Sequence, residues 1–165
     1  MNEDFIDALL YGQFPNFKNQ SFDELILEKD IIESQLECYN ELQTERTTEK
    51  EVILNKIKDI EKLIEKNTQL LKEIKKQDLV ELYREETVGE YILLIKEIKQ
   101  HKSFIASLLD SEELNEINFR LDEYEEYLKN INFALNAINK QLERFGKLYE
   151  RKEAMFWSKS QGSNT

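Results

Sequence analysis

An unbroken helical stripe of large apolar side chains constrains this chain more than any other feature of its sequence. From Leu114 to Tyr149 these side chains recur alternately every third and every fourth residue without a miss. That spacing places them on one face of an α-helix, and it is the heptad pattern of helices that pack lengthwise. The positions are Leu114, Ile117, Leu121, Tyr124, Leu128, Ile131, Leu135, Ile138, Leu142, Phe145 and Tyr149.

The stripe predicts one long C-terminal helix over about 111–157, with Asp110 or Ser111 as its N-terminal cap. Such a helix is on the order of 70 Å long, whereas a compact ball of 165 residues is only about 40 Å across. We therefore expect an elongated all-α fold. Other helices should cover the stripe, because each buried Leu or Ile contributes roughly 1.5–3 kcal/mol.

A second stripe, within residues 21–83, supplies a surface of comparable length. Ser21 with Glu24 forms a capping box that predicts a helix start. Together the two stripes predict an antiparallel helical hairpin or bundle with coiled-coil heptads. The heptad positions in the second stripe are Ile53, Ile57, Ile60, Ile64, Asn67, Leu71 and Ile74.

Two points in this second stripe stay open from sequence. The polar stretch 43–51 contains a further capping box, Thr48 with Glu51, which favours a hairpin turn at 44–48. Steps of three and four also cross this stretch in register, as they would in a continuous helix with a solvated middle; we favour the turn. Asn67 either lies in a buried seam, where it would fix register, or is exposed.

A break in the apolar pattern at 84–90 predicts where the chain reverses direction. Gly89 costs about 1 kcal/mol inside a helix, and Thr87 with Glu90 forms another capping box. We expect the reversal within 84–110, followed by the long C-terminal helix.

The N-terminal residues differ from the rest, because a short amphipathic helix is followed by Gly12 and Pro15, which end it. Phe14 and Phe17 in the following loop could form a docking hook, but we expect them to pack back on the body of the protein. The predicted organisation is an N-terminal arm with a short helix (1–20), a single helical coiled-coil domain (21–157) and a flexible tail (158–165).

The residue counts exclude several kinds of catalytic or metal site. With His101 as the only histidine, the chain cannot form a di-iron bundle, and one cysteine excludes a multi-cysteine zinc site. Cys38 lies beside the second stripe, so we expect a half-buried, inert thiol. EELNE, 112–116, matches half of the carboxylate set of all-α Mg-dependent nucleotide hydrolases, and the second half is missing. We expect no catalytic, cofactor-binding or metal-binding residues and no enzyme.

The overall charge limits the partners. A net charge of −11 repels phosphate and so disfavours nucleic acid as a partner. The first residues are acidic where a signal peptide would be basic, and the longest apolar run, YILLI at 91–95, is too short to span a bilayer. We expect a soluble, intracellular protein without a membrane span.

The charge is also unevenly distributed. Residues 110–126 carry a net charge of −7, whereas 140–159 carry +3 with aromatic residues interleaved. Basic side chains complement the dipole at a helix C-terminus, but aromatic residues and Arg are also enriched in binding hot spots. The predicted partner interface is Phe145, Tyr149, Arg151, Phe156 and Trp157.

These features favour a non-enzymatic protein–protein interaction subunit. It would be a coiled-coil structural or adaptor component of a larger assembly, with helical proteins or its own copies as partners. The alternative is an assembly or secretion-type chaperone or inhibitor that shields a partner's apolar helix or basic surface. An all-α Mg-dependent nucleotide hydrolase is a remote third hypothesis.

Overall fold

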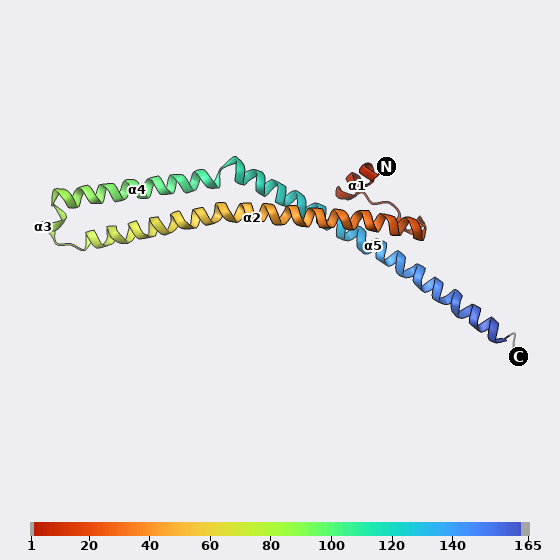
Figure 1. The fold of residues 1–165 in the computed structure, drawn as a ribbon. Coiled ribbons are helices and arrows are strands. Elements are labelled where there is room, and N and C mark those ends of the chain that lie inside the picture. The colour runs from red at the N-terminus through yellow and green to blue at the C-terminus, as the bar shows by residue number, and fades with distance from the viewer. Residues whose placement is uncertain (1, 163–165) are drawn as a thin grey trace. The chain divides into compact units, whose positions relative to one another are not determined.

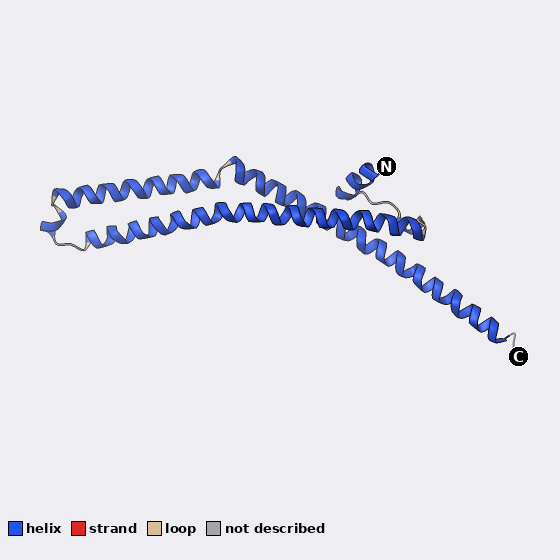
Figure 2. Cartoon of the chain, viewed as in Figure 1, coloured by secondary structure: helices blue, strands red, loops and turns tan. Residues whose placement is uncertain are grey.

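The computed structural model describes residues 2–162, with side chains at 4–78 and 80–157, and this part of the chain contains helices but no strand (Figures 1 and 2). The predicted all-α fold is therefore confirmed. In chain order the helices are α1 (Asn2–Leu10), the short 3-10 helix η1 (Phe17–Asn19), α2 (Phe22–Lys75), α3 (Leu79–Leu82), α4 (Glu85–Leu109) and α5 (Glu112–Gly162). The long C-terminal helix is thus α5, and it continues to Gly162, into the predicted tail.

The chain forms two compact units, and the long helices α2 and α5 contribute to both. The first unit comprises Met1–Thr44 with Asp122–Thr165, and the second comprises Glu45–Leu121. The first unit therefore combines the N-terminal arm with the start of α2 and most of α5.

In the first unit, α2 and α5 run antiparallel, as the sequence predicts. The rings of Phe22 and Phe145 lie 5.9 Å apart, and those of Tyr39 and Tyr127 lie 5.2 Å apart. Residues later in α2 therefore contact residues earlier in α5, as in an antiparallel pair. The buried core residues are Ile6, Leu9, Leu10, Phe17, Leu25, Ile32, Tyr124, Tyr127, Ile131, Ala134, Leu135 and Ile138.

The N-terminal arm packs on α5, as expected for Phe14 and Phe17. Phe17 is buried, and the Phe14 ring lies 4.6 Å from that of Phe133. Gly12 adopts a φ of 85°, a left-handed conformation that favours glycine, and so ends α1. The buried side chain of Asn130 donates its Nδ2 hydrogen to the Leu10 carbonyl at 2.7 Å, which ties the end of α1 to α5.

In the second unit, α2 packs antiparallel to α4. The Asn67 amide donates to Glu97 Oε2 at 3.2 Å, and the Lys75 ammonium lies 6.0 Å from the centre of the Tyr91 ring. Asn67 is half-buried, so it occupies the helix–helix contact and its amide has a partner there. A small buried cluster of this unit consists of Ile53, Ile57, Leu114 and Ile117, and Ile74 and Leu94 are also buried.

The predicted hairpin turn at 44–48 is wrong, because α2 passes through it as one helix. The Thr44 hydroxyl donates to the Asn40 carbonyl at 2.9 Å, a bond within the helix rather than a cap. Arg46 and Glu49 form an ion pair at 3.0 Å across one helical turn. Residues 43–51 contain no Gly or Pro that would break a helix. The local interactions within the stretch are therefore sufficient for α2 to continue through it.

The chain reverses direction earlier than predicted, because α2 ends at Lys75 and α4 already begins at Glu85. The connection occupies the residues between α2 and α4 and includes α3, where Asp78 Oδ1 accepts the Glu81 backbone N–H at 3.0 Å. α4 begins at Glu85, so Thr87 lies inside the helix and the capping box predicted there is wrong. Gly89 also lies inside α4, because the free-energy cost of one glycine is too small to end the helix. The space beside Gly89 is open, with no heavy atom within 4 Å of the position that a Cβ would take.

Two predicted helix starts are confirmed. Ser21 Oγ accepts the Glu24 backbone N–H at 3.2 Å at the start of α2. Ser111 Oγ accepts the Leu114 backbone N–H at 3.2 Å and donates to the Leu108 carbonyl, so it joins α4 to α5.

Candidate protein-binding surface

The predicted seam residues lie on the inner faces of the two units, and none of them is fully exposed. Buried seam residues are Ile53, Ile57, Ile74, Leu114, Ile117, Tyr124, Leu128, Ile131, Leu135 and Ile138. Half-buried seam residues are Ile60, Ile64, Asn67, Leu71, Leu121 and Leu142. The chain itself therefore covers the stripe of α5 as far as Leu142.

Beyond Phe145 the same stripe continues without cover. Phe145, one of the predicted interface residues, packs on the core cluster and against Phe22, the first residue of α2. α5 then extends a further 17 residues, to Gly162. Over this extension the large apolar side chains are between 50% and 70% exposed, and they are Leu148, Tyr149, Met155, Phe156 and Trp157.

The exposed side chains form a narrow face rather than a scattered set. At about 100° per residue, Leu148, Tyr149, Met155 and Phe156 lie within about 120° of one another around α5, whereas Trp157 lies about 80° beyond Tyr149, between Glu153 and Glu150. We call the first four the open stripe. Leu148 and Met155 are absent from the predicted interface. The signal that could have found them is their spacing of seven residues, directly before Tyr149 and Phe156.

The open stripe has flanks of opposite charge. On one side lie Arg144, Lys147 and Arg151, which we call the basic flank. On the other side Glu153 lies about 40° beyond Tyr149, whereas Glu150 and Glu143 lie about 100° and 120° beyond it, toward the back of α5; we call these three the acidic flank. All six side chains are exposed. Lys152 lies within the open stripe, between Tyr149 and Phe156.

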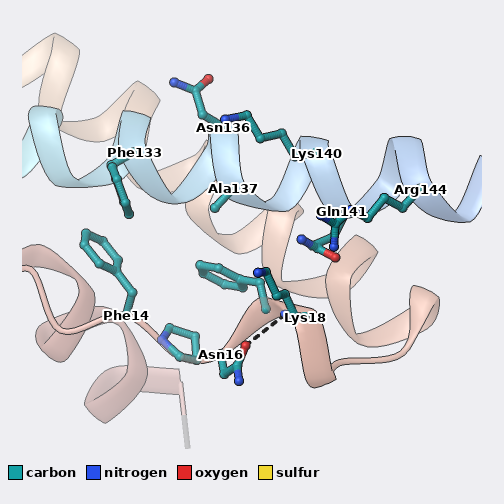
Figure 3. Close-up of a pocket in the computed structure, with 11 residues that line it drawn as sticks. Phe14, Asn16, Lys18, Phe133, Asn136, Ala137, Lys140, Gln141 and Arg144 are labelled. Carbon is teal, nitrogen blue, oxygen red and sulfur yellow. Dashed lines mark hydrogen bonds between the residues drawn. The ribbon is translucent and has the colours of Figure 1, made fainter.

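A groove in the first unit adjoins the basic flank (Figure 3). It has a volume of about 460 Å³ and lies between the N-terminal arm and α5. Phe14 and Phe133 face each other at one end, and Lys140 and Arg144 come from α5 toward the other (Figure 3). Its lining contains three cationic side chains and no acidic one, in a chain with a net charge of −11. The lining residues are Phe14, Pro15, Asn16, Phe17, Lys18, Phe133, Asn136, Ala137, Lys140, Gln141 and Arg144.

A second hollow continues this basic surface along α5. Arg144, Lys147, Leu148 and Arg151 line about 320 Å³. Because Arg144 belongs to both hollows, the groove and the basic flank form one continuous surface beside the open stripe. Cationic and aromatic groups together suit a partner that offers both apolar and acidic side chains.

Near the start of α2, Glu28 sits in an incompletely paired site. Glu28 Oε1 accepts a hydrogen bond from Gln20 Nε2 at 2.9 Å, whereas Glu28 Oε2 and Gln20 Oε1 are buried without a hydrogen-bond partner among the described residues. Burial raises the pKa of Glu28, the bond from Gln20 opposes that rise, and nearby Glu24 adds to it. The ionised form of Glu28 therefore destabilises the fold at neutral pH.

Glu28→Gln is expected to stabilise the protein at neutral pH by about 0.5–1.5 kcal/mol, since it removes the charge of a half-buried carboxylate, an effect that solvent screening reduces, and adds a donor for the Gln20 oxygen. A raised pKa means that the wild type regains this stability as pH falls through the Glu28 pKa, so the gap between the two proteins should close below about pH 4.3. Urea unfolding from pH 7 to pH 4 measures the gap. The exposed Glu37→Gln is the control. An equal gap at every pH would contradict the assignment.

The structure also places the residues that bear on catalysis and metal binding. Cys38 is exposed, so the expected half-buried thiol is wrong; it lies on the outer side of α2. His101 is half-buried on α4. Among the described residues no group of three or more His, Cys, Asp or Glu side chains is arranged to hold a metal ion.

Within residues 2–162, no helix combines the length and the apolar character needed to cross a bilayer. Searches against other proteins add no relative: the chain matches no protein-family model, no curated protein and no solved structure.

Proposed function

We propose that this chain is a non-enzymatic interaction subunit that binds a helical protein partner through the C-terminal part of α5. The observation that carries the proposal is the open stripe. The apolar periodicity of α5 is the same on both sides of Phe145, yet the chain covers it only up to that residue. Exposed apolar patches of this kind mark interaction surfaces in soluble and assembled proteins.

The shape of the open stripe favours a helix as its partner. It is about 120° wide and follows the helical repeat, which matches the apolar face of another amphipathic helix. Arg144 and Arg151 on one border of the open stripe and Glu153 on the other would then set the register and orientation of the partner helix.

The basic groove supports the same proposal from the adjacent surface. Lys18, Lys140 and Arg144 surround an apolar floor, and none of the lining residues is acidic. A partner with acidic side chains beside its apolar face would neutralise these cations while its apolar face covers the open stripe.

Substitution of the exposed aromatics should remove partner binding while leaving the fold intact. Phe156→Ala and Trp157→Ala each delete a large exposed ring, so each should weaken binding about tenfold or more, the usual effect at a hot spot. Helix content measured by circular dichroism should stay unchanged, because neither residue belongs to the chain's own core. Tagged wild-type and variant chains would be compared by quantitative cross-linking and mass spectrometry in the native cell.

The control is Phe119→Ala, which removes an equally exposed ring from α5 outside the open stripe. Equal recovery of partners by the wild type, the two variants and this control would contradict the proposal. A fall in helix content for Phe156→Ala or Trp157→Ala would instead assign these rings to the fold.

A further inference from the structure

We infer that the groove between the N-terminal arm and α5 binds an extended acidic segment of a protein partner. One apolar side chain of the segment would contact Phe14 and Phe133 at the aromatic end, and carboxylates would pair with Lys18, Lys140 and Arg144 at the cationic end. The inference rests on the proposed function for the class of partner, a protein, and adds a second recognition element beside the open stripe. All five residues belong to the first unit.

The two walls of the groove change from apolar to cationic in the same direction. On α5, Phe133, Lys140 and Arg144 lie within about 40° of one another and span about 16 Å along the helix. On the arm, Phe14 lies opposite Phe133, and Lys18 lies on the side of Arg144 (Figure 3). The groove therefore has one end suited to an apolar side chain and one end suited to negative charge.

The cationic end has no counter-ion within the part of the chain that the structure describes. Lys18, Lys140 and Arg144 are exposed, and none of them belongs to an ion pair among those residues. The groove lining contains no acidic side chain, although the whole chain has a net charge of −11. Because the rest of the surface repels acidic ligands, this groove is where a carboxylate-bearing segment can bind.

The aromatic end favours a protein segment over a nucleotide or another small anion. The rings of Phe14 and Phe133 lie 4.6 Å apart, in direct contact, so a nucleotide base cannot stack between them. Phe133 is 59% exposed, and this exposed part of the ring can contact a Leu or Phe side chain. A small ligand usually has most of its surface buried in its pocket, whereas the cations of this groove are exposed at its rim.

The amide side chains of the lining favour an extended segment over a helix. Asn136 and Gln141 form no hydrogen bond among the described residues. A helix pairs its own backbone N–H and C=O groups, whereas an extended segment leaves them free to bond with such amides.

The length of the groove sets the spacing within the segment. An extended chain rises about 3.3 Å per residue, and alternate side chains point to the same side. A carboxylate four residues from the apolar side chain therefore lies about 13 Å along the groove, between the levels of Lys140 and Arg144 at about 10 and 16 Å from Phe133. A carboxylate at the fifth place points to the other wall, which contains Lys18.

The probe is a labelled ten-residue peptide of Gly and Ser that carries one Phe and, four and five places after it, two Glu. A second peptide has the reverse order, because side chains alone do not set the direction in which a backbone lies. Fluorescence anisotropy with the full chain should show saturable binding of one of them, with a Kd of about 100 µM or less that rises with salt. Replacing both Glu by Gln, or Phe by Ala, should weaken that binding about tenfold or more.

Charge reversal in the groove is the matched test on the protein. Lys140→Glu should weaken binding of the Glu peptide about tenfold or more, and it should prefer a peptide with Lys at the fourth place. Lys129→Glu, at an exposed site of α5 outside the groove, makes the same change in net charge and should leave binding unchanged. Phe133→Ala should weaken binding of the Phe peptide but have little effect on the peptide with Ala in its place.

The groove and the open stripe are tested separately by these measurements. Equal binding of the Glu and Gln peptides, or equal losses for Lys140→Glu and Lys129→Glu, would overturn the inference. Displacement of the peptide by a lower concentration of inorganic phosphate or a mononucleotide would assign the groove to a small anion instead. A dimer of the chain alone that Lys140→Glu abolishes would assign it to a second copy. If no peptide binds while Phe156→Ala still loses partners in the native cell, the proposed function stands and the inference about the groove falls.

Discussion

Ile131→Ala is expected to lower the free energy of unfolding by about 2–5 kcal/mol, the usual cost of truncating a fully buried aliphatic side chain. Ile131 is 0% exposed in the cluster formed by α1, α2 and α5, so its removal leaves a cavity that all three helices would have to close. Urea denaturation followed by circular dichroism measures the change.

Leu148→Ala is the matched control, since it truncates a large aliphatic side chain of the same helix in the open stripe. Its effect on the unfolding free energy should stay within about 0.5 kcal/mol. A loss below about 1 kcal/mol for Ile131→Ala, or equal losses for both variants, would show that the chain does not cover α5 at Ile131.

Asn130→Asp is expected to release the N-terminal arm at a cost of about 1–3 kcal/mol, because the substitution keeps the shape of the side chain and removes its donor. The Asn130 amide donates to the Leu10 carbonyl and lies 3.7 Å from a Cβ built on Gly12, so it holds the point where α1 ends. In the variant, an acidic oxygen faces that carbonyl. Limited proteolysis after the arm residues should become faster while α2 and α5 remain protected.

The control for this change is Asn136→Asp, an exposed residue in the groove lining, which introduces the same charge on the same helix. Proteolysis of the arm in this control should match the wild type. Equal cleavage rates for wild type and Asn130→Asp would mean that other contacts, such as the packing of Phe17, hold the arm without Asn130.

The sequence predicted those parts of the fold that depend on local pattern. The regular spacing from Leu114 onward defined α5, and the hydroxyls of Ser21 and Ser111 marked where helices begin. The antiparallel pairing of α2 with α5 followed from two long stripes that each needed cover, whereas the pairing of α2 with α4 was not predicted, because residues 84–110 were assigned to the reversal. Repetition over many residues made these predictions robust.

The wrong predictions, the turn at 44–48 and the helix start at Thr87, both rest on a short capping-box motif. Thr48 with Glu51 resembles a cap, but the helix bonds through Thr44 and the Arg46–Glu49 pair were equally available. The reversal between α2 and α4 depends on Asp78 capping a four-residue helix, which no apolar period could indicate.

Contacts between residues far apart in the chain were out of reach of the sequence. The bond from Asn130 to Leu10 joins positions 120 residues apart, and the groove forms only once the arm folds back onto α5. Likewise, the periodicity includes Tyr149 in the stripe, but it cannot indicate the residue of α5 beyond which the rest of the chain no longer covers the stripe. That point is fixed by the start of α2, where Phe22 meets Phe145.

α5 is one continuous helix whose apolar face is covered by its own chain up to Phe145 and uncovered beyond it, and the proposed function depends on this difference. Amide hydrogen exchange along α5 at about 1 µM, where weak self-association is negligible, tests this most directly. We predict slow exchange over 124–145 and exchange about a hundredfold faster or more over 148–157. Equally slow exchange over both segments at low concentration, or fast exchange over 124–145, would contradict the account.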